Sequence, residues 1–225
     1  MKITHIQHAC FLLETNGKTI VMDPFVTNLE AVLHKFPQFL HPDYIIASHG
    51  HDDHIGSLFD ILGKNTQIIG IVELCAYLKK HGAHNTIALN YGGSIDIDGI
   101  TIHLTPALHT SSSTCGEYLG EACGIIINAE GHTVYHFGDT GIFGDMALIN
   151  ELYKPDIGLI PIGGRYTMDA KQAAYVCNNY FDFKTVIPMH YGTFPTLISD
   201  PNEFVNIVKK GNVLLLDNYS SLEVR

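Results

Sequence analysis

Three glycine-containing turns, each between two strand-like runs, constrain the fold of this 225-residue chain more than any other feature. The turns are Asn16-Gly17, Asp98-Gly99 and Glu130-Gly131. Pairs of this kind accept the left-handed backbone of a two-residue hairpin turn, and the flanking runs are rich in Ile, Val, Leu and Phe. We therefore expect β-hairpins over residues 6–23, 94–108 and 124–137, with residues 6–14 forming the first strand.

Helical segments are expected between and after these hairpins. Apolar spacing and end signals predict helices over residues 29–36, 55–63, 73–82 and 169–180. No low-complexity tract or linker interrupts the mixture of strands and helices, and the chain length suits one large domain. The sequence therefore predicts a single α/β domain that covers residues 1–225.

A weak internal repeat indicates two halves of similar topology. Residues 17–23 (GKTIVMD) and 131–139 (GHTVYHFGD) both run from a turn glycine through a strand to an aspartate. Further along, Pro42-Asp43 and Pro155-Asp156 each open another apolar strand. Two such halves would bring their strand ends to one shared edge, where α/β folds place their binding sites.

Composition excludes several classes of protein. Apolar residues make up 46% and charged residues 16%, so the chain is not disordered, and the formal charge of −10 disfavours nucleic-acid binding. The five cysteines form no CxxC pair and suit a reducing compartment. The N-terminal run lacks a signal-peptide core, and no apolar stretch is long enough to cross a membrane. We expect a cytoplasmic protein without membrane association.

The segment YIIASHGHDDHIGSL carries the strongest chemical signal. It places four metal-ligating side chains within six residues, directly after a strand-like run: His49, His51, Asp53 and His54. Imidazole and carboxylate groups together can hold two neighbouring divalent ions. A polar turn that caps a helix is the alternative, but such a cap needs only one of these residues.

Four ligands cannot saturate two ions, so further ligands are expected at the ends of other strands. Three residues each follow an apolar run: His109, Asp139 and His190. Taken singly, they could be a loop histidine, a turn-forming aspartate and a partly buried polar residue. Together with the cluster at residues 49–54, they favour a site for two metal ions.

These residues give the chain its resemblance to a known family. The HxHxDH pattern and the later His109, Asp139 and His190 resemble the metallo-β-lactamase superfamily over nearly the whole chain. The segments HACF, MDPF, SHGHDDHIG, FGDTGIF, PIGGRYTMD and MHYGTFP look like the small hydrolases related to ascorbate-6-phosphate lactonase. The resemblance implies a four-layer αββα sandwich of two pseudo-repeated halves, with the site in a groove at one edge of the sheets.

The resemblance also implies a division of the ligands. The first metal would be held by His49, His51 and His109, the second by Asp53, His54 and His190, with Asp139 bridging both. Two divalent ions are expected, with Zn or Mn favoured and Fe or Ni left open.

Five more residues are candidates for supporting roles. Asp23 would accept a hydrogen bond from a ligand imidazole, or would only form an Asp-Pro turn. His8 resembles the family's N-terminal histidine near the groove, or is a structural residue in an edge strand. Arg165 could grip an anionic group, and Tyr191 and Thr193 could hydrogen-bond the substrate, or all three could be ordinary loop residues.

The expected activity is hydrolysis of a small-molecule ester, lactone or phosphoester by a hydroxide shared between the metals. Asp53 would be the catalytic residue that orients this hydroxide and carries its proton. No GxSxG segment competes with this reading, and the serine-rich residues 111–114 are expected to shape the groove. The substrate is expected to be a small molecule, and Arg165 is the candidate to bind an anionic group on it. A homo-oligomer is left open.

Three alternatives remain at this point. A nuclease resembling RNase Z or RNase J is disfavoured by the acidic charge and by the short segment between Asp139 and His190. An oxygen- or nitric-oxide-reducing diiron protein would carry glutamate in place of His51. A metal-binding module without catalysis would use Asp53 only as a ligand.

Overall fold

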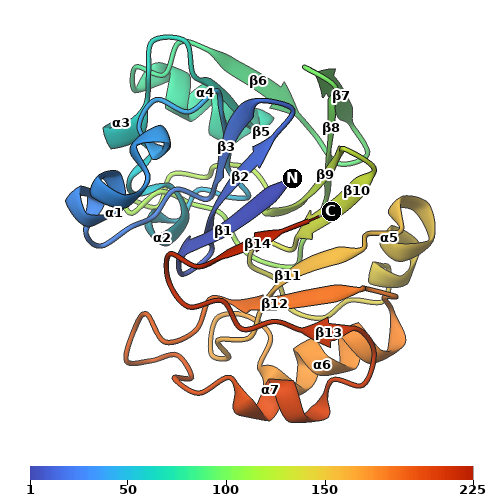
Figure 1. Ribbon diagram of the computed structural model, residues 1–225. Coiled ribbons are helices and arrows are strands. Elements are labelled where there is room, and N and C mark those ends of the chain that lie inside the picture. Colours follow the sequence, from blue (N-terminus) through green and yellow to red (C-terminus); the bar gives the residue numbers. More distant parts are fainter. Residues whose placement is uncertain (225) are drawn as a thin grey trace.

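The computed structural model describes residues 1–224, and its strands within that range form two sheets of seven (Figure 1). The first sheet has the order β14 (Ser221–Glu223), β1 (Lys2–Gln7), β2 (Cys10–Thr15), β3 (Lys18–Met22), β4 (Tyr44–Ile46), β5 (Gln67–Ile71) and β6 (Thr86–Leu89). The second has the order β13 (Asn212–Val213), β12 (Thr185–Met189), β11 (Ile157–Pro161), β10 (His132–His136), β9 (Cys123–Ala129), β8 (Ile100–Pro106) and β7 (Ser94–Ile97).

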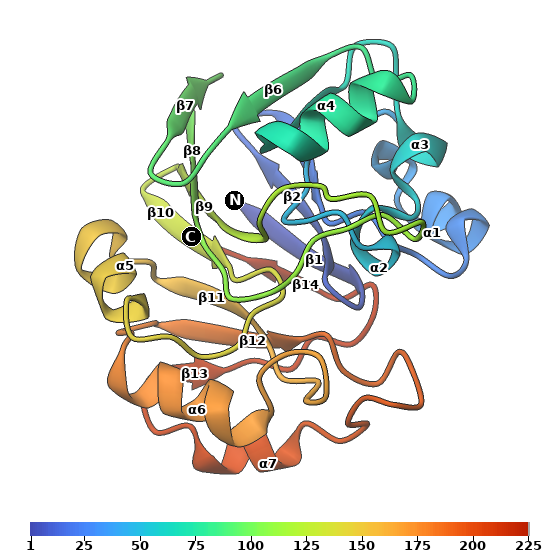
Figure 2. The ribbon, with the colours of Figure 1, turned by 180° about the vertical axis from the view of Figure 1, so that it is seen from behind.

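Helices cover the outer face of each sheet, as Figures 1 and 2 show. Over the first sheet lie α1 (Leu29–Lys35), the 3₁₀ turn η1 (Pro37–Phe39), α2 (Asp52–Ile55), α3 (Leu58–Ile61) and α4 (Val72–Lys80). Over the second lie α5 (Met146–Tyr153), α6 (Ala170–Asn179) and α7 (Asn202–Ile207). The predicted αββα sandwich is therefore confirmed.

Alternation along the strands explains the four layers. In β2, Phe11 and Leu13 pack between the sheets against residues such as Ile125 of β9, whereas Leu12 packs under the outer helices. Successive side chains of a strand point to opposite faces, so a strand that is apolar at every position must be covered on both sides. The central layer between the sheets and the two helix-covered layers are the result.

The two halves share one topology, as the internal repeat predicts. Strands β2 and β3 pair antiparallel and β3 to β6 run parallel, and β9 to β13 repeat this arrangement. The two Pro-Asp positions also act alike. The Asp43 carboxylate accepts a hydrogen bond from the Thr19 amide at 2.9 Å, and that of Asp156 accepts one from the Thr133 amide at 2.8 Å.

The three predicted hairpins are confirmed as β2–β3, β7–β8 and β9–β10. In each turn both central residues have positive φ, for example 50° at Asn16 and 71° at Gly17. This backbone matches the right-handed twist of the paired strands. The helix predicted over residues 169–180 is also present as α6, and Asp169 and Gln172 form a reciprocal capping box at its start.

Two predicted boundaries are wrong for tertiary reasons. The strand expected over residues 6–14 is interrupted at His8, which has φ 58° and ends β1, so β1 and β2 form a hairpin of their own. The helix expected over residues 55–63 is split into α2 and α3. Its break lies at Ser57, whose amide donates to the Pro24 carbonyl at 2.9 Å and whose hydroxyl accepts from the Val26 amide at 3.1 Å.

Within the described residues, no helix is long and apolar enough to cross a membrane. The loops that carry the predicted ligands follow β4, β8, β10 and β12. They meet at one edge of the sandwich.

Candidate metal centre

All seven predicted ligands lie together at this edge of the two sheets. The chain enters the site after β4 with His49, after β8 with His109, after β10 with Asp139 and after β12 with His190. Asp53 and His54 stand in the first turn of α2, while His51 immediately precedes that helix. The prediction that residues from both halves converge at a shared edge is therefore met by the geometry.

One group of nitrogen atoms comes from His49, His51 and His109. Each residue offers one ring nitrogen, and the three atoms lie within 4.8 Å of one another. The Nε2 atom of His49 and the Nδ1 atom of His51 are 3.0 Å apart. Three imidazoles that present nitrogen atoms to a common point are a usual ligand set for zinc and related ions.

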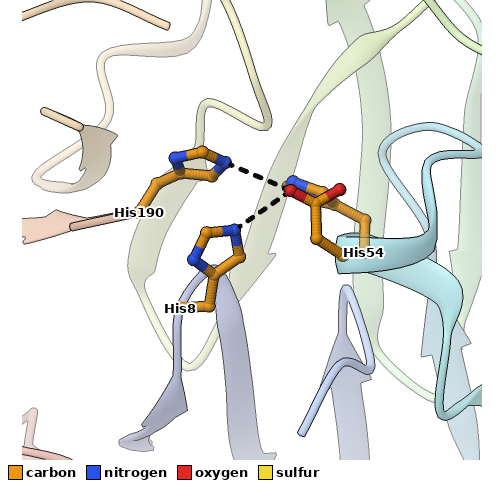
Figure 3. A group of neighbouring side chains, drawn as sticks. His8, His54 and His190 are labelled. Atoms are coloured by element: carbon orange, nitrogen blue, oxygen red, sulfur yellow. Dashed lines mark ion pairs between the residues drawn. The ribbon is translucent and has the colours of Figure 1, made fainter. Parts of the chain in front are cut away.

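A second group comes from Asp53, His54 and His190, joined by His8 (Figure 3). One ligand atom from each of the four lies within 4.8 Å of the others. The rings of His8 and His190 approach Oδ2 of Asp53 with their Nε2 atoms at 3.4 and 3.7 Å. This set offers three imidazoles and a carboxylate.

Asp139 lies between the two groups. Its Oδ2 atom is 3.0 Å from Nε2 of His190 and 3.6 Å from Nε2 of His109, and its Oδ1 atom is 3.3 Å from Nε2 of His54. Its side chain is buried. A carboxylate in this position has one oxygen close to a nitrogen of each group, as a bridging ligand requires.

The position of His8 differs from the edge-strand alternative. Strand β1 lies between β14 and β2, so it is not an edge strand, and His8 itself occupies the turn after it. The ring of His8 is 3.9 Å from that of His190 between centroids, and its Nδ1 atom is 3.1 Å from Oγ1 of Thr193. The structure thus brings His8 in among the second group.

Several buried polar atoms of the site lack a hydrogen-bond partner among the described residues. They are Nε2 of His8, Nε2 of His54, both ring nitrogens of His190 and Oδ1 of Asp139. Leaving a buried polar atom unpaired costs about 1–3 kcal/mol, so such a concentration needs an explanation. Divalent cations would accept these lone pairs, and the imidazole and carboxylate donors fit Zn, Mn, Fe or Ni.

Asp23 and Ser48 orient two of these imidazoles. The buried Asp23 carboxylate accepts hydrogen bonds at 2.7 Å from Nδ1 of His54 and from both the amide and the hydroxyl of Ser48. Because the Ser48 hydroxyl donates to Asp23, it accepts from Nδ1 of His49 at 3.0 Å. In their neutral form both histidines then carry the proton on Nδ1, which leaves Nε2 free to bind a cation.

Charge within the site shifts the pKa values of its ionisable groups. Burial acts to lower the pKa of His54, but Asp139 and Asp23 overcome it and hold this pKa well above its ordinary range. The same opposition, with Asp139 as the main partner, raises the pKa of His190 to about 9. Burial and the neighbouring His54 lower the pKa of His49 well below its ordinary value. Histidine pKa values that are shifted in opposite directions within one cluster are typical of a functional site.

The remaining candidates have different surroundings. Arg165 is exposed, with its guanidinium carbon 5.5 Å from the ring centroid of Tyr166. Tyr191 lines a separate cavity together with His5 and Thr193. Thr193 reaches the site through its contact with His8.

Two supporting features went beyond the sequence prediction. The role of Ser48 was not anticipated, although it directly precedes His49 at the end of a strand. In the serine-rich loop, the Ser111 hydroxyl accepts a hydrogen bond from the Gly50 amide at 3.1 Å, so this loop holds the ligand-bearing turn.

Comparison with known proteins identifies the family. Residues 2–190 match the beta-lactamase superfamily domain. The chain is 43% identical over 211 residues to a UPF0173 metal-dependent hydrolase from Methylocella silvestris, with 91% of each chain covered. A protein of the same description from Pelotomaculum thermopropionicum is 40% identical over 235 residues, with full coverage of both.

A solved structure is similar as well. Igni18, a metallo hydrolase from the hyperthermophilic archaeon Ignicoccus hospitalis, superimposes with a TM-score of 0.86 at 35% identity. The match covers 100% of this chain and 99% of that one. Fold, site and relatives define a metal-dependent hydrolase of the metallo-β-lactamase type. Within that superfamily the chain belongs to the UPF0173 metal-dependent hydrolases.

Proposed function

We propose that this protein is a binuclear metal-dependent hydrolase that cleaves a small-molecule ester or lactone, with a phosphoester as the alternative substrate. The observation that carries the proposal is the position of Asp139 between two histidine groups, with an oxygen near a nitrogen of each. A single ion would bind to only one of the two histidine groups. The formal charge of −10 supports a small molecule over a nucleic acid as substrate.

We assign the ligands to the two ions as the resemblance implies. His49, His51 and His109 would hold one ion and Asp53, His54 and His190 the other, with Asp139 shared. Mixed imidazole and carboxylate sets suit Zn or Mn, and Fe or Ni also bind such sets. A pair of divalent ions, when bound, supplies an activated water at neutral pH and polarises the oxygen of the scissile bond.

Asp53 is the proposed catalytic residue. Its side chain is 32% exposed, whereas Asp139 is almost fully buried, so Asp53 is the carboxylate that a substrate can reach. Burial acts to raise the pKa of Asp53, but the neighbouring rings of His190 and His8 keep it well below its ordinary value. The ionised Oδ2 atom can orient the attacking water, hold its proton and deliver that proton to the leaving group.

His8 helps to orient the Asp53 carboxylate. Its Nδ1 atom contacts Thr193 and its Nε2 atom faces Oδ2 of Asp53, so the ring fixes the direction of the carboxylate. The other positioning residues, Asp23 and Ser48, fix the rings of His54 and His49. Together they hold the reacting groups in place before a substrate arrives.

We also propose that the chain works as one domain in the cytosol. The proposed ligands His49 and His190 come from opposite halves, and the central core packs strands of both halves together. Neither half alone would complete the site. All five cysteines are free, which suits a reducing compartment.

The test combines metal analysis with a substrate screen. We expect two divalent ions per chain by elemental analysis, and turnover of at least one class among lactones, carboxylic esters, thioesters and phosphoesters when Zn and Mn forms are compared. One ion per chain at saturating metal, with Asp139 bound to it alone, would refute the binuclear assignment. Failure of every class with a fully loaded protein would refute the hydrolytic one.

A further inference from the structure

A cavity of about 560 Å³ opens directly beside the proposed catalytic carboxylate. Its lining includes Asp53 and His190 at the metal centre, with Asp52 next to them. The rest of the wall is formed by Phe25, Tyr166, Phe194, Pro195 and Thr196. Cavities of roughly 300–1,000 Å³ accommodate small organic ligands, so this space is large enough for a substrate group.

Two phenylalanines form the wall nearest to the reacting groups. Phe25 follows β3 in the MDPF segment, and Phe194 follows β12 in MHYGTFP. Their ring centroids are 5.9 Å apart, with 35° between the ring planes. The ring of His8 meets both edge-on, at 5.7 Å from Phe25 and 5.3 Å from Phe194. The aromatic wall is thereby fixed relative to Asp53, which His8 also contacts.

The aromatic side chains are not hidden in the core. Phe194 is 36% exposed and Tyr166 is 54% exposed, and Phe25 is half-buried. Keeping large apolar groups in contact with water costs free energy that burial against a ligand would recover. Three aromatic residues around one opening to a metal centre therefore favour an apolar or aromatic guest.

The charges around the cavity disfavour an anionic guest. Among the described residues that line it, the charged side chains are Asp52 and Asp53, and no lysine or arginine is present. Arg165 lies over the ring of Tyr166 and is exposed, outside the lining. A carboxylate or phosphate placed against the phenylalanines, away from the proposed ions, would meet the Asp52 carboxylate without a lysine or arginine in the lining to offset it.

We infer that this cavity binds a neutral aromatic or apolar group of the substrate, held against Phe25 and Phe194 with the scissile ester bond next to Asp53 and His190. The inference rests on the proposed hydrolase function and specifies its substrate class. It differs from one of the two possibilities that the sequence leaves open, in which Arg165 binds an anionic group of the substrate. Phe25 and Phe194 are then specificity-determining residues.

The first test compares three acetate esters on the metal-loaded protein: phenyl acetate, its anionic analogue 4-acetoxybenzoate, and methyl acetate, which lacks a ring. We expect Phe194→Ala to raise KM for phenyl acetate about tenfold with kcat changed less than about threefold, because an aromatic contact is lost. For methyl acetate the variant and the wild type should match. 4-Acetoxybenzoate should show a KM about tenfold or more above that of phenyl acetate.

Control variants separate specificity from damage to the fold. Phe59→Ala removes a phenylalanine that is 45% exposed on α3, outside the cavity, and should leave all three KM values unchanged. Phe25→Leu keeps an apolar side chain in the half-buried position and should give a smaller rise in KM than Phe194→Ala. Equal effects of Phe194→Ala on phenyl acetate and methyl acetate would overturn the inference while leaving the hydrolase function intact.

A binding measurement does not depend on turnover. Benzyl alcohol, a neutral aromatic compound without a hydrolysable bond, should bind the metal-loaded protein and perturb the NMR signals of Phe25 and Phe194. Phe194→Ala should weaken this binding about tenfold, and Phe59→Ala should not. Binding without turnover of any lactone, carboxylic ester, thioester or phosphoester would uphold the cavity assignment and refute the proposed function. Absence of binding at Phe25 and Phe194 would overturn the inference.

Discussion

Nδ1 of His54 lies 2.7 Å from Oδ2 of Asp23, and both side chains are fully buried. This hydrogen bond selects the tautomer of His54 that leaves Nε2 directed at Asp139. Asp23 also accepts two hydrogen bonds from Ser48, which in turn holds His49. One carboxylate thus orients a ligand from each of the two histidine groups.

Asp23→Asn should therefore weaken metal binding without removing a ligand. We expect affinity to fall about 10–100-fold, as is usual when the partner of a ligand imidazole is lost. Competition with a chelator of known affinity measures the change. Asp60→Asn, at an exposed carboxylate on α3, is the matched control and should bind metal like the wild type. An unchanged affinity in Asp23→Asn would mean that Asp23 does not set the tautomer.

Asp53→Asn should separate turnover from metal binding. The amide keeps an oxygen for a cation but cannot hold a proton, so we expect kcat to fall at least about 100-fold. Metal content should fall far less, because His54, His190 and Asp139 stay in place. Steady-state kinetics and elemental analysis on the same preparation, with Asp60→Asn as control, give both values. Parallel losses of metal and activity would make Asp53 only a ligand.

Most of the correct predictions from the sequence depend on residues that are close together along the chain. The three hairpins depend on adjacent turn residues such as Asn16 and Gly17, and the α6 start depends on Asp169 and its near neighbour Gln172. The cluster from His49 to His54 is equally local. Its density alone indicates a metal site, wherever the rest of the chain lies.

Features that depend on contacts between distant segments were not predictable in this way. His8 leaves the strand path because its carbonyl accepts a hydrogen bond from the His190 amide at 3.1 Å, and nothing near residue 8 encodes that contact. Phe25 and Phe194 stand in segments that the sequence singles out, but their shared cavity exists only because the loops after β3 and β12 meet. A pattern search along the chain cannot measure such proximity.

His136 should make the fold sensitive to acid. Its Nε2–H donates to the Ala9 carbonyl at 2.8 Å, and its Nδ1 accepts from the Gly138 amide at 3.1 Å, so the buried ring is neutral. Burial lowers its pKa in the folded protein. Below a pH of about 6.5, His136 is therefore protonated in the unfolded chain but stays neutral in the folded chain. The contribution of His136 to the free energy of unfolding should be constant above that pH and should decrease below it.

His136→Gln tests this dependence. Glutamine can still donate to Ala9 but does not titrate, so the free energy of unfolding of the variant should lose less between pH 7 and pH 5.5. The difference can reach about 1.4 kcal/mol per pH unit, the most that one proton allows. Urea unfolding of the two metal-free proteins across this range measures it. Identical pH slopes would show that His136 is protonated in the folded state or contributes nothing.

Cys115 should be the one thiol that reacts rapidly in the folded protein. All five cysteines lie in the described range, and Cys115 is exposed while the other four are buried. Burial raises the pKa of Cys75 to about 11 and that of Cys177 to about 12, which keeps both as inert thiols at neutral pH. A thiol reagent at pH 8 should therefore modify one group in the native protein and all five after denaturation. Cys115→Ser should abolish the rapid phase; a rapid reaction that survives in this variant would mean that a buried cysteine is transiently opened to solvent.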